Sequence, residues 1–120
     1  MSEIKSYRDL IVWQKAMQAA TSIYEASRTF PREEQFALTS QLRRSAVSIP
    51  SNIAEGYGRG SKPDYVRFLQ IARGSLFEAQ TQLELAIQLR FIPSSASPEI
   101  QDLLQEIERM LNSMISKLSC

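Results

Sequence analysis

The side chains best suited to chemistry in this sequence lie between residues 43 and 73. Six basic residues occur there against two acidic ones, so this segment carries +4 while the remaining chain carries −3. Clustered cations contact phosphate groups, and the candidate nucleic-acid contacts are Arg43, Arg44, Arg59, Lys62, Arg67 and Arg73. A solvated helix face is the alternative, because Arg67 and Arg73 point about 120° apart on a helix.

A polar stripe crosses the least generic part of the chain, around Pro50. Residues three or four apart share a helix face, and this stripe comprises Arg44, Ser48, Asn52, Glu55 and Arg59. One interpretation is structural: the stripe satisfies backbone groups that Pro50 frees, and Glu55 pairs with Arg59. The other is a polar binding surface made by Ser48, Asn52 and Glu55.

Three glycines at alternate positions, Gly56, Gly58 and Gly60, superficially resemble a phosphate-binding loop. Such loops follow a strand, and the Lys-Ser/Thr ending of a P-loop is missing. We interpret the glycines as a helix end followed by a tight turn. Tyr57, near Arg59, is the best candidate for base stacking.

The chain contains no histidine, which excludes His-dependent general bases, Ser-His and Cys-His pairs, and most zinc or haem sites. The acidic residues show no spacing typical of a metal or acid/base site. The single cysteine, Cys120, is the last residue. We therefore predict a protein that is not an enzyme, with no catalytic residues, metal, cofactor or small-molecule substrate.

Length and composition suit one domain spanning residues 1–120, because 43% of the 120 residues are apolar. A net charge of +1 gives no general attraction to nucleic acid or to anionic membranes. The longest apolar run, residues 10–13, is too short to span a membrane, and the first five residues lack the apolar core of a signal peptide. One cysteine cannot form an internal disulfide, so we expect a cytoplasmic protein without membrane contact.

Helical periodicity of the apolar residues predicts an all-α fold, an antiparallel up-down-up-down four-helix bundle with short loops. The expected helices span about residues 7–28, 33–58, 63–90 and 98–118. Ser6 with Asp9 forms a capping box for the first helix, and Ser61 and Ser97 cap the last two. Pro50 removes one backbone hydrogen bond within the second helix, which predicts a kink there.

The first predicted helix carries two apolar stripes. One stripe is Leu10, Trp13, Met17, Ala20, Tyr24 and Ser27, and its neighbour is Val12, Ala16, Ala19, Ile23 and Ala26. Together they cover about 200° of the helix, more than one bundle core needs. The surplus predicts contact with a partner protein. Three aromatic residues on core stripes are expected to pack inside: Trp13, Tyr24 and Phe68.

Five longer motifs follow one another along the chain: Asp9–Ala16, Phe30-Pro31-x-x-Glu34, Leu38–Arg44, Ser48–Gly56 and Arg67–Ser75. Over about residues 7–118, this sequence resembles the bacterial four-helix-bundle family, also called the 23S ribosomal RNA intervening-sequence proteins. Members are often encoded within insertions in ribosomal RNA genes, and their role is undefined. Known members form ring-shaped homopentamers, so the resemblance implies a ring-shaped homo-oligomer here. A similar bundle, the basic accessory protein of diversity-generating retroelements, partners a reverse transcriptase and nucleic acid, and the present chain differs from it in being nearly neutral.

Two hypotheses follow. The first is a non-enzymatic homo-oligomeric bundle that binds RNA weakly through a basic face. The second is a protein-interaction or scaffold module that never contacts nucleic acid. The arrangement of the six candidate cations distinguishes them: a single shared face favours RNA, and dispersal favours the scaffold.

Overall fold

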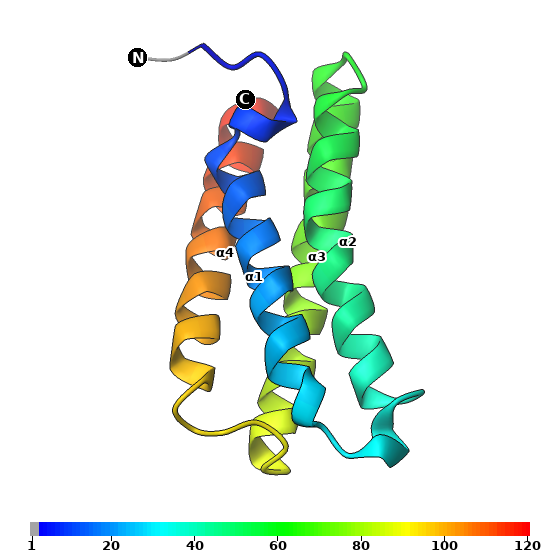
Figure 1. Ribbon diagram of the computed structural model, residues 1–120. Coiled ribbons are helices and arrows are strands. Elements are labelled where there is room, and N and C mark those ends of the chain that lie inside the picture. The colour runs from blue at the N-terminus through cyan, green and yellow to red at the C-terminus, as the bar shows by residue number, and fades with distance from the viewer. Residues whose placement is uncertain (1–2) are drawn as a thin grey trace.

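The computed structural model describes residues 3–120, and these residues form helices and no strand. The helices are α1 (Ile11–Ala26), α2 (Leu38–Tyr57), α3 (Lys62–Gln88) and α4 (Ser97–Ser119). Three short 3-10 turns are η1 (Tyr7–Asp9), η2 (Ser27–Thr29) and η3 (Arg32–Glu34). Successive helices run in opposite directions (Figure 1). The all-α prediction is confirmed, and Met1 and Ser2 of the predicted domain lie outside the described residues.

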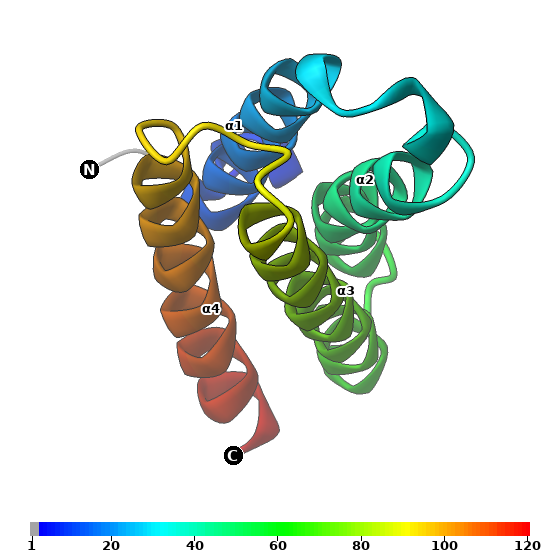
Figure 2. The same cartoon turned by 90° about the horizontal axis from the view of Figure 1, so that it is seen from below.

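Each helix packs against the helices adjacent to it in sequence, and α1 also contacts α4. The contact between α2 and α3 is the most extensive, and the two helices lie side by side in both views (Figures 1 and 2). The buried faces of the four helices meet in one core. In the second helix, apolar residues at helical spacing predict a buried face, and all five of them are buried: Leu38, Leu42, Ala46, Ile49 and Ile53.

The first two helices begin later than expected. The capping box of Ser6 and Asp9 exists, but it closes η1, and extended backbone at Leu10 separates η1 from α1. α2 begins at Leu38 rather than near residue 33, because η3 and a further turn occupy residues 32–37. The backbone angles of Ala37 (φ −123°, ψ −107°) are outside the helical region and separate that turn from α2.

The caps of the last two helices differ from each other. The Ser61 hydroxyl accepts a hydrogen bond from the Asp64 N–H (3.3 Å), as expected for the cap of α3. Ser97 does not cap α4, because it is already the first residue of that helix and its hydroxyl donates to the Ser94 carbonyl (3.4 Å). α2 continues through Pro50 without ending. The kink at Pro50 stays a prediction.

Candidate functional site

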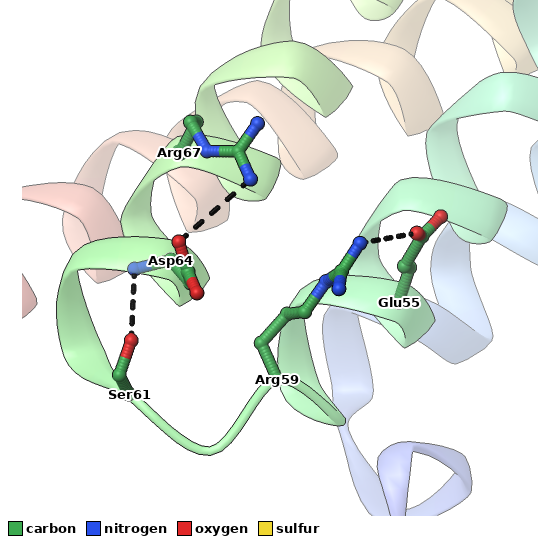
Figure 3. Close-up of polar contacts among 5 residues, drawn as sticks. All are labelled: Glu55, Arg59, Ser61, Asp64 and Arg67. Carbon is green, nitrogen blue, oxygen red and sulfur yellow. Dashed lines mark hydrogen bonds and ion pairs between the residues drawn. The ribbon is translucent and has the colours of Figure 1, made fainter.

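Three of the six candidate cations lie at the turn between α2 and α3: Arg59, Lys62 and Arg67. The chain can reverse there because Gly58 ends α2 and Gly60 adopts a positive φ of 85°, a conformation that side chains with a Cβ rarely adopt. Ser61 then starts α3. These local signals bring Arg59, at the end of α2, close to Arg67 in the second turn of α3 (Figure 3).

Each arginine at this turn is held by a carboxylate and by an aromatic ring. Arg59 Nη2 lies 3.0 Å from Glu55 Oε2, and Arg67 Nη2 lies 3.7 Å from Asp64 Oδ1. Their guanidinium carbons lie 4.8 and 4.7 Å from the centre of the buried Phe68 ring. Exposed ion pairs of this kind contribute under about 1 kcal/mol. They orient the arginines, but they also offset much of the positive charge.

The other three candidate cations lie elsewhere. Arg43 donates from Nε to the Ser27 hydroxyl (2.7 Å) and from Nη2 to the Tyr24 carbonyl (3.2 Å), so it satisfies the C-terminal end of α1. Arg73 donates to Asn112 of α4 (2.9 Å). Arg44 is exposed on α2, about 22 Å along the helix axis from residue 59. One copy of the chain therefore has no single face that gathers all six cations.

The polar stripe contacts α3 through Ser48. The hydroxyls of Ser48 and Ser75 are 2.7 Å apart, and Asn52 Nδ2 donates to the carbonyl (2.8 Å) and the hydroxyl (2.9 Å) of Ser48. Ser45 donates to Gln82 Oε1 (2.8 Å) across the same contact. The carbonyl that Pro50 deprives of its usual donor belongs to Ala46. Asn52 therefore does not replace that bond. Within the stripe, Ser48 bonds α3 and Asn52 holds Ser48. Glu55 pairs with Arg59, as the structural interpretation expects.

Gly56 has a role that the sequence interpretation missed. A Cβ at this position would lie 2.7 Å from the Cβ of Phe68 and 3.2 Å from the ring of Tyr65. Gly58 and Gly60 form the helix end and the turn, as interpreted, whereas Gly56 lies inside α2 and allows α3 to approach closely. We call this contact the α2–α3 seam; it consists of Ser45, Ser48, Asn52, Gly56, Tyr65, Phe68, Ser75 and Gln82.

The candidate stacking residue Tyr57 packs edge-on against Tyr65, with ring centres 6.1 Å apart. Burial raises the pKa of Tyr65 above its ordinary value of 10.0, and the neighbouring Tyr57 raises it further. Tyr57 is half-buried in this pair. It extends the seam rather than standing free as a platform for a base.

On its other side, α2 forms an open apolar groove with α1. This α1–α2 groove has a volume of about 500 Å³ and is lined by Tyr7, Trp13, Met17, Ala20, Thr21, Tyr24, Val47, Pro50, Ser51 and Ala54. None of these residues is charged. The stripe containing Val12 enters the core. Four residues of the other stripe line the groove, Trp13, Met17, Ala20 and Tyr24, and Met17 and Tyr24 are 42% and 43% exposed. Tyr24 was expected to pack inside and does not, whereas Phe68 is buried and Trp13 is half-buried.

A second hollow, of about 470 Å³, continues from one end of this groove. Its lining residues are Tyr24, Gln35, Phe36, Thr39, Ser40, Arg43, Arg44 and Val47. Phe36 is 91% exposed, the most exposed of the large apolar side chains described. Phe36 belongs to none of the motifs or stripes recognised in the sequence. The available signal was an aromatic residue just before a helix and outside every apolar stripe.

The described residues contain no arrangement that suggests catalysis by a bound metal. No group of three or more His, Cys, Asp or Glu side chains within residues 3–120 is placed to hold a metal ion. In the same part of the chain, no helix is both long enough and apolar enough to cross a membrane. The surfaces that stand out are therefore the cationic turn and the α1–α2 groove.

Comparisons with known proteins agree with this architecture. The family described as 23S rRNA-intervening sequence protein matches residues 8–113. A solved structure from Bacteroides thetaiotaomicron, a protein with unknown function from the S23 ribosomal protein family, is similar to this chain. Its TM-score is 0.80 at 29% sequence identity, covering 88% of this chain and 98% of that one. A comparison with curated proteins gave no match.

Proposed function

We propose that this chain, which belongs to the 23S rRNA-intervening sequence protein family, is a non-enzymatic protein-interaction scaffold that assembles as a ring-shaped homo-oligomer. The observation that carries the proposal is the α1–α2 groove. Monomeric proteins seldom leave a continuous apolar surface uncovered, and such surfaces mark interaction sites. The pentamer implied by the family resemblance is the expected assembly.

The dispersal of the candidate cations favours this scaffold hypothesis over a general RNA-binding face. Arg43 is engaged by α1 and Arg73 by α4, and Arg59 and Arg67 each face a carboxylate. A binding role without chemistry also agrees with the lack of histidine.

Sedimentation equilibrium of the full chain at micromolar concentration tests the scaffold proposal. We expect a species several times heavier than the 13.6 kDa monomer. A single 13.6 kDa species across the concentration range would overturn it.

A second candidate function, weak RNA binding, is supported specifically by the turn between α2 and α3. Arg59 and Arg67 are already oriented there, and Lys62 forms no ion pair with any described residue. Five copies would bring about fifteen such cations to a ring, and affinity would come from avidity with little sequence preference. This candidate requires that the turns of all copies face the same side.

Fluorescence anisotropy tests RNA binding, with a structured ribosomal RNA fragment and a random single strand titrated across a salt series. Changing Arg59→Glu together with Lys62→Glu should weaken binding about tenfold or more without changing oligomer size. The matched control reverses two exposed cations outside the candidate set, Arg28→Glu and Lys117→Glu, and should change affinity less. Each lost contact to a single strand should reduce the log–log salt slope by about 0.7. No binding by the natural chain at low salt would leave the scaffold function alone.

A further inference from the structure

We infer that Phe36 of one copy inserts into the α1–α2 groove of the next copy, at the end formed by Met17, Tyr24 and Val47. This head-to-tail contact would build the ring, and the inference rests on the self-assembly proposed above. It goes further in naming the inserted side chain, the receiving surface and the direction of assembly.

The segment that carries Phe36 is braced in an outward position. Three backbone bonds between residues three apart hold the turn: Glu34 N to Pro31 O (2.9 Å), Gln35 N to Arg32 O (3.1 Å) and Ala37 N to Glu34 O (3.0 Å). Glu34 Oε1 also accepts from the Leu38 N–H (3.3 Å). Because the turn is already ordered, docking Phe36 loses little conformational entropy. An exposed aromatic ring on a rigid turn is typical of an interface anchor.

The groove offers what an aromatic side chain requires. Its lining has no charged residue, and its volume of about 500 Å³ exceeds that of one phenyl ring. Phe36 lies beside this groove in its own chain, since the adjoining hollow shares Tyr24 and Val47 with it. The ring is nevertheless 91% exposed, so Phe36 does not fill the groove of its own copy.

The positions of Phe36 and of the groove that receives it suit a closed ring. The C-terminal end of α1, the start of α2 and the turn between them lie at the same end of the bundle (Figure 1). Tyr24 is in the last turn of α1, and Val47 is midway along α2. When Phe36 of one copy enters the groove of the next, the two copies are related by a rotation with little displacement along the bundle axis. Head-to-tail contacts of this kind close into rings, whereas a displacement along the axis would produce filaments.

Charge complementarity at the edge of the contact favours a second copy as the occupant. Glu33 is exposed and lies three residues before Phe36 on the same connection between α1 and α2. Arg44 is exposed beside Tyr24 and Val47. Neither Glu33 nor Arg44 forms an ion pair with another described residue. Docking Phe36 would bring Glu33 of one copy towards Arg44 of the next.

Two variants of the full chain test the contact, one on each side, and both are studied by sedimentation equilibrium. Phe36→Ser removes the inserted ring, and Met17→Glu places a charge in the groove. Both positions are exposed, so each variant should keep its helical circular dichroism and give a 13.6 kDa monomer. The matched control is Phe77→Ser, which removes a different exposed aromatic ring, on α3. This variant should remain oligomeric.

Mixing the two monomeric variants gives the sharper test. Phe36→Ser retains a working groove and Met17→Glu retains a working Phe36, so one contact can form and a dimer of twice the monomer mass is expected. If the Phe36→Ser variant remains fully oligomeric, this inference is wrong and the scaffold proposal still stands. A mixture that stays monomeric would also overturn it. If the natural chain is a monomer, both the inference and the scaffold proposal fail.

Discussion

The two sides of α2 differ in how completely they are covered. Towards α3, the seam is closed by hydroxyl and amide hydrogen bonds and by the approach of Gly56 to Phe68. Towards α1, the groove is apolar and open, with Val47 42% exposed. The most distinctive sequence motif therefore serves mainly helix packing. The surface suited to a partner is the α1–α2 groove. Its only signal in the sequence is the excess of apolar residues on α1.

The largest expected effect concerns Gly56. Gly56→Ala should lower the free energy of unfolding by about 2–4 kcal/mol, because the new Cβ would meet the Cβ of Phe68, which cannot rotate away. Urea denaturation measures this change. Gly74→Ala is the control: it lies within α3 with nothing within 4 Å of an added Cβ, and should raise stability by about 0.5–1 kcal/mol. Equal effects at the two glycines would contradict the close approach at the seam.

Pro50 lies in α2 and lines the groove, so its replacement probes the open side. Pro50→Ala should restore the N–H that bonds the Ala46 carbonyl and should straighten α2. The free energy of unfolding should rise by about 1–2 kcal/mol. The cost of a proline inside a helix is removed, and this gain exceeds the loss of burial of the proline ring. Crystal structures of both forms would check the geometry. If the axes of α2 superimpose along its whole length, the predicted kink is wrong.

An effect of similar size but opposite sign is expected for the serine pair of the seam. Ser48→Ala should cost about 1–2 kcal/mol, because it leaves the buried Ser75 hydroxyl without this partner. The double change with Ser75→Ala should cost less than the sum of the two single changes, which a double-mutant cycle measures. Ser51→Ala on the groove side is the control and should change stability by less than about 0.5 kcal/mol. Simple additivity at Ser48 and Ser75 would show that the pair is not coupled.

The smallest effect appears only in alkaline solution. Burial raises the pKa of Tyr65, so the unfolded chain loses this proton at a lower pH than the folded chain. Stability should therefore fall as the pH rises above about 10, and should be unaffected by this group at neutral pH. The urea concentration at the midpoint of unfolding, measured from pH 8.5 to 11, should fall less steeply with pH for Tyr65→Phe than for the natural chain. Identical profiles for the natural chain and Tyr65→Phe would refute the assignment.

Local signals in the sequence explain where the prediction of the fold succeeded and where it did not. Apolar periodicity identified the helices, and the residues around Gly58 and Ser61 correctly marked the turn between α2 and α3. The late start of α2 was missed because 3-10 turns and helix starts share the same acidic and capping residues. Ser97 was misplaced as a cap for a similar reason: a serine before a proline fits either the cap or the first helical turn.

The sequence by itself determined the helical class, the buried face of α2 and the excess apolar surface of α1, because these depend on the 100° step between successive helical residues. Only the tertiary structure decided which stripe of α1 enters the core, since both stripes are apolar and the choice depends on where α4 and α2 pack. It alone assigned Gly56 to a close approach and dispersed the six cations among different neighbours. The exposure of Phe36 also depends on the path of the chain between two helices, which no periodic pattern encodes.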